Sequence, residues 1–146
     1  MNLLFAINQK FVDLLCNCIC SIEKNGGADH DDAYILYSDL RDEDKVHIDL
    51  VAGENVNCRC ITVDDPIFDG FLETNRYPRQ IYYRLAEPML LPSDLDRILY
   101  LDADLIVINS LKELYNTDIN NVIVKRLLDD KIEIRPNIRI QKSIIE

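Results

Sequence analysis

The sequence predicts an α/β fold in which a mostly parallel sheet is flanked by helices, and two observations support this prediction. Apolar segments of strand length alternate along the chain with segments whose apolar residues recur at helical spacing. One apolar run, within residues 96–109, is rich in Leu, Ile and Val, which is typical of a strand buried on both faces inside a parallel sheet. The 146 residues are enough for one domain with a substantial core.

The first unit of the predicted fold is a strand, a short polar turn and a helix. Residues 2–7, of which 3–7 are apolar, predict a buried strand, which ends in the polar loop 8–10. Apolar residues then recur every three or four positions through residues 11–24, which indicates an amphipathic helix. The sequence Asn25-Gly26-Gly27 ends this helix, because glycine readily adopts positive φ. This unit is typical of the start of a Rossmann-like sheet.

The middle of the chain predicts two further strands and two helices. After an acidic loop, residues 33–38 predict the second strand, and residues 39–51 predict a short amphipathic helix. Residues 58–63 predict the third strand. Residues 64–80 contain proline and glycine and predict a loop, whereas residues 80–90 predict a helix that Pro88 ends or kinks.

The apolar run within residues 96–109 predicts the next strand, and the remaining elements are weaker. Residues 110–115 predict a capped helical turn that begins at Ser110. Residues 121–124 are apolar and fit one more strand. Residues 125–146 form a charged tail whose isoleucines have no evident partner element.

Charge and cysteine content exclude some classes of function. The chain has 16 Lys and Arg against 26 Asp and Glu, a net charge of −10, which argues against binding to nucleic acid. No run approaches the about 20 apolar residues that a membrane helix needs, and the N-terminus does not resemble a signal peptide. Five cysteines without an export signal predict reduced thiols in a cytoplasmic protein. They lack the Cys-x-x-Cys and His spacing of zinc sites, so we interpret them as small buried apolar residues.

Asp102 and Asp104 interrupt the apolar run where its strand is expected to end. Open α/β sheets bind ligands at the carboxyl ends of their strands, which favours a functional site here. Carboxylates flanked so closely by apolar residues are costly to bury, and a divalent cation would compensate them because hard cations bind carboxylate oxygens. The simpler alternative is a strand-to-turn junction, where Asp is favoured because it hydrogen-bonds nearby backbone amides.

Several stretches, in this order, resemble glycosyltransferase family 8. They are Asn-Leu-Leu-Phe-Ala-Ile-Asn at 2–8, Ile-Tyr-Tyr-Arg-Leu at 81–85, Leu-Pro-Ser-Asp-Leu-Asp-Arg-Ile-Leu-Tyr-Leu-Asp-Ala-Asp at 91–104 and Leu-Lys-Glu-Leu-Tyr-Asn-Thr-Asp at 111–118. The similarity runs from residue 1 to about residue 120. Ordered motifs at the right spacing are far more specific than Asp-x-Asp alone.

The resemblance implies a GT-A fold, which is a Rossmann-like nucleotide-diphospho-sugar transferase fold, and a retaining hexosyltransferase activity. Such enzymes transfer galactose or glucose from a UDP-sugar to a glycan acceptor such as lipopolysaccharide, and peripheral association with a membrane is compatible with that acceptor. A Mn²⁺ or Mg²⁺ cofactor would be held by Asp102 and Asp104. Binding of the nucleotide-sugar would fall to Ala6, Ile7, Asn8, Arg84, Asp102, Ala103 and Asp104. No catalytic residue beyond these is identified.

The role of Arg84 has a simpler alternative. The resemblance places this arginine near the donor sugar and diphosphate, where its planar donors suit phosphate oxygens. A surface arginine on a helix, paired with Glu87 or Glu73, fits the same pattern.

The sequence departs from the family pattern in two ways. Asn8 and Gln9 stand where the family usually has an acidic residue that contacts the nucleotide. Family members are also about twice as long, and their Phe-Asn-x-Gly strand, Asp-Gln-Asp segment and metal-binding C-terminal His are absent from this sequence.

The shorter length leads to a prediction about organisation. We expect a truncated nucleotide-sugar-binding domain at 1–124, with its C-terminal part missing, followed by a divergent charged tail at 125–146. Transfer is then expected to be impaired, and the alternative is a non-catalytic remnant that binds nucleotide or metal. An unpaired sheet edge or an exposed apolar face is expected where the missing half would pack.

Overall fold

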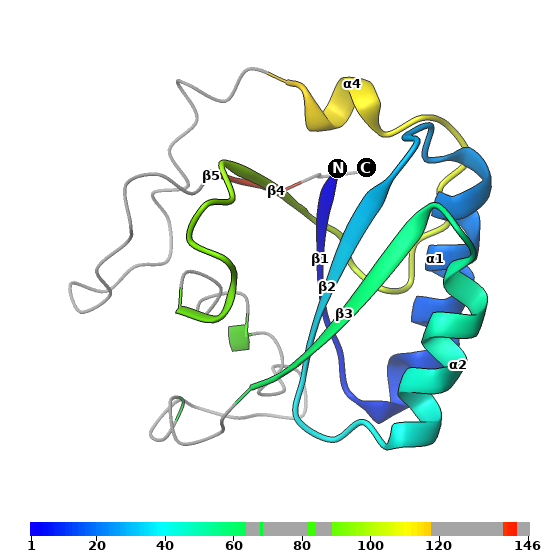
Figure 1. Ribbon diagram of the computed structural model, residues 1–146, viewed down its shortest axis with the longest axis vertical. Coiled ribbons are helices and arrows are strands. Elements are labelled where there is room, and N and C mark those ends of the chain that lie inside the picture. Colours follow the sequence, from blue (N-terminus) through cyan, green and yellow to red (C-terminus); the bar gives the residue numbers. More distant parts are fainter. Residues whose placement is uncertain (64–67, 69–81, 84–88, 118–138, 143–146) are drawn as a thin grey trace.

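The computed structural model describes most of the predicted sheet and both of its main helices. The described residues are 1–63, 68, 82–83, 89–117 and, for the backbone alone, 139–142. Within them the chain forms a five-stranded sheet in the order β3-β2-β1-β4-β5, and every adjacent pair is parallel (Figure 1). The strands are β1 (Asn2–Ala6), β2 (Asp31–Tyr37), β3 (Val56–Thr62), β4 (Arg97–Tyr100) and β5 (Arg139–Lys142). The α/β prediction is therefore confirmed.

The helices α1 (Val12–Asn25) and α2 (Asp42–Ala52) cover one face of the sheet (Figure 1). A short 3-10 turn, η1 (Gln9–Phe11), precedes α1, and a single helical turn, α4 (Lys112–Tyr115), follows β4. Both main helices confirm the predicted ones, with ends shifted by up to three residues. Among the described residues, no helix is long and apolar enough to cross a bilayer.

Three predicted elements fall mainly or wholly outside the described residues. The loop predicted at 64–80 and the strand predicted at 121–124 are of this kind. Of the helix predicted at 80–90, the structure describes residues 82–83 and 89–90, which have helical backbone.

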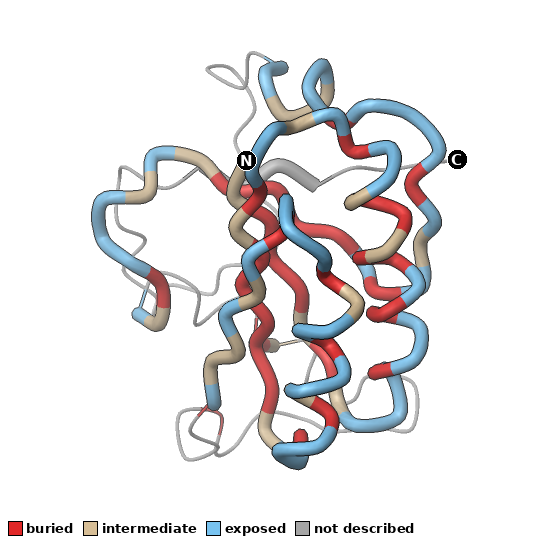
Figure 2. The backbone as a smooth tube through the Cα atoms, turned by 45° about the vertical axis from the view of Figure 1, so that its right-hand side comes forward, coloured by how far each residue is buried: buried red, intermediate tan, exposed pale blue. Residues whose placement is uncertain are grey.

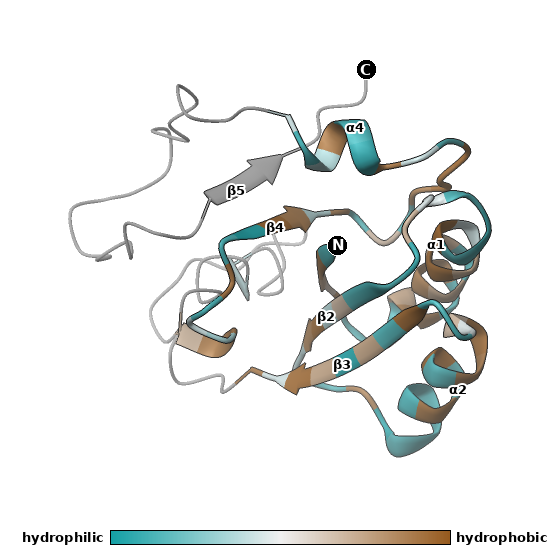
Figure 3. Ribbon diagram, turned by 45° about the horizontal axis from the view of Figure 1, so that its top comes forward, coloured by the Kyte–Doolittle hydropathy of each residue, from teal (hydrophilic) through white to brown (hydrophobic). Residues whose placement is uncertain are grey.

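The strands β1, β2 and β4 are buried on both faces, as their apolar runs predict. Leu3 and Phe5 of β1 face α1 and share a core with Ile35 and Leu99, whereas Leu4 lies on the opposite face. That second face carries Tyr34, Leu36, Ile98 and Tyr100, packed against Tyr83 and Leu91 from the segment before β4. Figure 2 shows the buried strands through the middle of the molecule. Along the edge strand β3, hydrophobic and hydrophilic residues alternate (Figure 3), and burial alternates with them.

The expectation that the C-terminal tail has no partner element is wrong for four of its residues. Its isoleucines have no partner that the sequence reveals, but residues Arg139–Lys142 form β5, which pairs in parallel with Arg97–Tyr100 of β4. Edge strands carry unpaired N–H and C=O groups that can bond to any extended segment, and this explains how a mixed-polarity segment joins the sheet. On the loop after β4, Ile106 is 62% and Ile108 is 76% exposed; the unpaired edge or apolar face expected for a missing half stays a prediction.

Candidate functional site

The order of the strands reverses at one place in the sheet, between β1 and β4. From β1 the sheet grows through β2 to β3 on one side and through β4 to β5 on the other. In open α/β sheets, ligands bind outside the carboxyl ends of the strands at such a switch point. The loops that follow β1 and β4 leave the sheet at this place, so the topology selects them as a candidate site.

The register brings the two loops together. Leu4 of β1 lies opposite Tyr100 of β4, and the backbone N–H of Leu101 donates to the carbonyl of Leu4 at 3.0 Å. Both strands end within a few residues of this pair. The residues predicted to bind the nucleotide at 6–8 and the predicted metal-binding segment that begins at Asp102 therefore lie on adjacent strand ends.

Asp102 and Asp104 lie directly after β4, as the sequence predicts. Both are exposed, whereas Ala103 between them is 7% exposed and Leu101 before them is 2% exposed. The expectation that their apolar neighbours make these carboxylates costly is therefore wrong. The chain buries the intervening residues and leaves the charges in water. Both carboxylates are free to meet a ligand, and folding needs no cation to compensate them.

The carboxylates of Asp102 and Asp104 suit a hard divalent cation. The two carboxylates offer hard oxygen ligands, and among the residues the structure describes no three His, Cys, Asp or Glu side chains are grouped to hold a metal. Mg²⁺ commonly binds one or two carboxylates and completes its shell with water and substrate phosphate oxygens. Asp102 and Asp104 fit such an ion shared with a phosphate ligand. They do not form a closed all-protein cage.

The loop after β1 holds the residues expected at the nucleotide. Ile7 is 1% exposed and its N–H donates to the carbonyl of Leu36 at 3.0 Å, so its side chain belongs to the core. Ala6 and Asn8 are half-buried. The Asn8 side chain accepts a hydrogen bond from the N–H of Lys10 at 3.0 Å and so caps η1.

Asp39, which the sequence analysis did not single out, adds a carboxylate beside this loop. Its Oδ1 accepts a hydrogen bond of 3.1 Å from the backbone N–H of Gln9. Asp39 is exposed and follows β2 by two residues, at the same edge of the sheet as Asn8. Its signal in the sequence is an acidic residue just past a buried strand. A carboxylate therefore contacts the backbone of this loop at Gln9.

The charge of Asp104 also affects the pKa of a cysteine in α1. Burial raises the pKa of the Cys18 thiol to about 12, and the charge of Asp104 contributes in the same direction. Burial likewise raises the pKa of Cys58 to about 12. All five cysteines are unpaired in the structure, and Cys16 and Cys18 are buried as apolar core residues, whereas Cys20, Cys58 and Cys60 are half-buried. Arg84, the remaining predicted site residue, lies outside the described residues.

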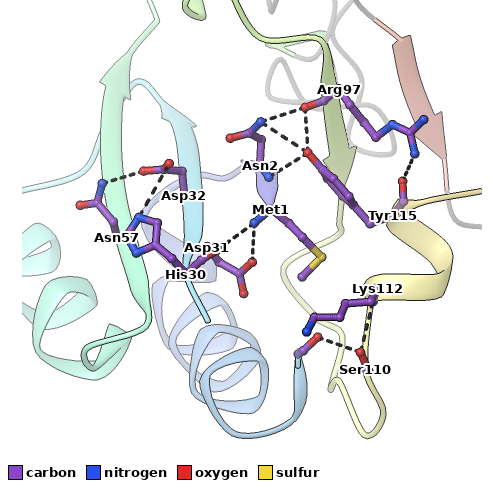
Figure 4. A network of polar contacts seen from close by, with 11 residues as sticks. Met1, Asn2, His30, Asp31, Asp32, Asn57, Arg97, Ser110, Lys112 and Tyr115 are labelled. Carbon is purple, nitrogen blue, oxygen red and sulfur yellow. Dashed lines mark hydrogen bonds and ion pairs between the residues drawn. The ribbon is translucent and has the colours of Figure 1, made fainter. Parts of the chain in front are cut away.

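A polar network occupies the opposite end of the sheet, at the start of β1 and β4 (Figure 4). The Tyr115 hydroxyl accepts from the N–H of Asn2 at 3.2 Å and donates to the carbonyl of Arg97 at 3.2 Å. The Arg97 guanidinium donates to the carbonyl of Tyr115 in return. The capped turn predicted to begin at Ser110 instead begins at Lys112, with Leu111 at the N-cap position and no capping side chain; the Ser110 hydroxyl accepts from the N–H of Lys112 at 3.3 Å. This end connects α4 to the sheet and carries no predicted site residue.

Comparison with known proteins gives one family. The model of glycosyl transferase family 8 matches residues 2–145, beyond the residue at which the sequence motifs end. Among solved structures, the galactosyltransferase LgtC in complex with donor and acceptor sugar analogs is 27% identical with a TM-score of 0.71. The bifunctional glycosyltransferase WbbM is 20% identical with a TM-score of 0.65, and GlyE of Streptococcus pneumoniae TIGR4 is 22% identical with a TM-score of 0.58.

These similarities cover most of the chain but only part of each relative. The LgtC match covers 82% of this chain and 43% of LgtC. The WbbM match covers 83% and 21%, and the GlyE match covers 81% and 27%, respectively. The chain thus spans less than half the length of the structures it matches. No curated protein sequence matches it.

Proposed function

The chain belongs to glycosyl transferase family 8, and from this premise we propose that it transfers a hexosyl unit, galactose or glucose, from a UDP-sugar to a glycan acceptor with retention. The observation that carries the proposal is the position of Asp102 and Asp104, two exposed carboxylates at the switch point of the sheet and beside the loop after β1. The similarity to LgtC, whose structure holds donor and acceptor sugar analogs, supports the same class of substrates.

Electrostatics make this proposal specific about metal. A diphosphate brought to Asp102 and Asp104 would meet two like charges on a chain whose net charge is −10. Binding of UDP therefore needs a cation between the phosphates and the carboxylates, and Mn²⁺ or Mg²⁺ suits oxygen ligands of this kind. When bound, such an ion supplies Lewis-acid stabilisation to the charge that develops on the UDP leaving group.

The protein's own residues divide the remaining work. Ala6 and Asn8 frame the base and ribose, with Ile7 held in the core behind them. Ala103 is packed into the sheet and fixes the spacing of the two carboxylates on either side of it. Arg84 contributes donors for phosphate oxygens as part of the same proposal. The acceptor is a growing glycan such as that of lipopolysaccharide.

A second candidate is binding of nucleotide and metal without transfer. It is favoured by the donor set among the described residues, where two carboxylates are not joined by a third ligand side chain. Two carboxylates that share a cation with a diphosphate can hold a nucleotide without orienting a donor sugar and an acceptor for transfer.

Release of UDP separates the two candidates. We expect Mn²⁺-dependent release of UDP from UDP-galactose or UDP-glucose if the chain is a transferase, and the Asp104→Asn variant should lose it. Metal-dependent binding of UDP without release would support the binding module. If the chain neither binds UDP nor releases it, both candidates are contradicted.

We also propose a cytoplasmic location. Five free cysteines persist where glutathione and thioredoxin keep thiols reduced, and this supports a reducing compartment.

A further inference from the structure

The loop after Asp104 is fastened to helix α1 by two side chains. The backbone N–H of Val107 donates to the Ser21 hydroxyl at 2.8 Å, and the Asn25 side-chain amide donates to the carbonyl of Val107 at 2.9 Å. Both backbone polar groups of Val107 are thus held by one turn of α1. Figures 1 and 3 show this loop passing along α1 between β4 and α4.

The Ser21 contact is the buried half of this arrangement. Ser21 is 8% exposed, and its hydroxyl donates to the carbonyl of Cys18 at 2.6 Å while it accepts from Val107. The donor capacity of the hydroxyl is therefore spent inside α1, which orients its oxygen toward the loop. The contact joins residues 86 apart in sequence.

The same loop is held again further along. The N–H of Leu111 donates to the carbonyl of Gly26 at 3.0 Å, and the Ser110 hydroxyl donates to that carbonyl at 3.3 Å. Val107 and Leu111 are 7% and 9% exposed and belong to the core cluster on the α1 face. The short segment between Asp104 and Val107 therefore starts at a strand end and finishes at a fixed point on α1.

We propose that Ser21 and Asn25 are positioning residues, which place the Asp102–Asp104 turn for binding of a metal–nucleotide diphosphate by holding Val107 from both sides. The inference rests on the proposed function, because it assigns these residues to the site formed by the two carboxylates. Only two residues separate Asp104 from the anchored Val107. Release of the anchor lets the turn, and with it the Asp104 carboxylate, move away from the β1 loop.

The test measures UDP affinity by calorimetry with Mn²⁺ and, separately, with a chelator. Outer partners of metal ligands typically change metal affinity or activity by about 10-fold or more when removed. We expect Ser21→Ala to lower the Mn²⁺-dependent affinity for UDP by about 10-fold. Ser21→Thr keeps the hydroxyl and should restore most of it. Asn25→Ala, on the exposed last turn of α1, should lower it by a smaller factor while the chain stays folded.

Tyr115→Phe is the matched control. It removes a hydroxyl that also bridges distant elements, but at the opposite end of the sheet, so it should lower stability and leave the Mn²⁺-dependent affinity for UDP unchanged. If Ser21→Ala and Asn25→Ala bind UDP as the unaltered chain does, or if Tyr115→Phe weakens binding equally, the positioning role is overturned while the proposed function stands. If the unaltered chain shows no Mn²⁺-dependent UDP binding, the proposed function fails and the positioning role fails with it.

Discussion

The Ser21 hydroxyl accepts a 2.8 Å hydrogen bond from the backbone N–H of Val107, 86 residues further along the chain. This contact connects the first helix of the fold to the loop that carries Asp102 and Asp104. If Ser21 and Asn25 position the Asp102–Asp104 turn as proposed, the candidate site is built from three parts of the chain, which are the loop after β1, the loop after β4 and the C-terminal half of α1. Substitutions in this turn of α1 are then expected to affect both stability and binding, because Ser21 is buried and also contacts the loop.

Replacement of Gly27 tests how tightly that loop packs. Gly27 has a φ of 81°, and a Cβ built there would lie 2.4 Å from the Ser110 Oγ. Gly27→Ala should lower the free energy of unfolding by at least about 1–2 kcal/mol, the cost of a left-handed backbone for an L-residue. Urea denaturation measures this change. A double-mutant cycle with Ser110→Gly should recover the part due to the collision. An unchanged urea midpoint in Gly27→Ala would contradict the packing described here.

The Tyr115 hydroxyl should contribute to stability without taking part in the site. Tyr115→Phe leaves the N–H of Asn2 without its partner and removes the donor to the carbonyl of Arg97. Loss of such a bond between partly buried groups costs about 1 kcal/mol, which urea denaturation can resolve. The same variant with unaltered stability would mean that solvent replaces the hydroxyl at both groups.

Asp44 should make the stability of the chain sensitive to acid. The Arg41 side chain donates to Asp44 at 3.0 Å and the Arg41 N–H at 2.9 Å, and these bonds hold the pKa of Asp44 below its ordinary value of 3.8. Because the folded-state pKa is depressed, the stability that Asp44 contributes is present above 3.8 and is lost as pH falls through the folded-state pKa.

The measurement is the difference in thermal midpoint between the unaltered chain and Asp44→Asn. We expect this difference to be largest above about pH 5 and to shrink below the ordinary carboxyl value. Arg41→Gln removes the donor side chain and should show a similar pH profile. A difference that stays constant down to strongly acidic pH would argue against the depressed pKa.

The rate of alkylation should distinguish Cys20 from Cys18 and Cys58. Burial raises the pKa of Cys18 and Cys58 to about 12, so almost none of either thiol is in the reactive thiolate form near about pH 8. Mass spectrometry after brief alkylation should find the half-exposed Cys20 labelled before both of them. Alkylation in urea, which should label all five at similar rates, is the control. Labelling of Cys58 in the folded chain as fast as Cys20 would contradict the environment assigned to it.

Local patterns predicted the parts of the fold that depend on them. The strands β1, β2 and β4 are apolar runs, and each is buried on both faces as such runs require. The position of Asp102 and Asp104 followed from the same pattern, because the apolar run breaks where β4 ends. Gly27 was predictable as a helix stop and has the positive φ that this role favours.

Contacts between distant segments were not predictable in this way. Ser21 lies on a helix as a polar residue, and nothing in the local pattern shows that it is buried against Val107. The strand β5 has mixed polarity and exists because the edge of β4 offers backbone partners. Asp39 meets Gln9 only because β1 and β2 are adjacent in the sheet. Exposure of Asp102 and Asp104 depended on how the chain turns after β4, which the sequence does not encode locally.

Calorimetric titration of UDP, with and without Mn²⁺, tests whether Asp102 and Asp104 bind a metal–diphosphate. It is made on the unaltered chain and on the double variant Asp102→Asn/Asp104→Asn. Because both carboxylates are exposed, their replacement should leave the fold intact, and circular dichroism verifies this. We expect UDP binding that requires Mn²⁺ and is lost in the double variant. Binding that is independent of Mn²⁺, or equal in both chains, would contradict a metal–diphosphate site at Asp102 and Asp104.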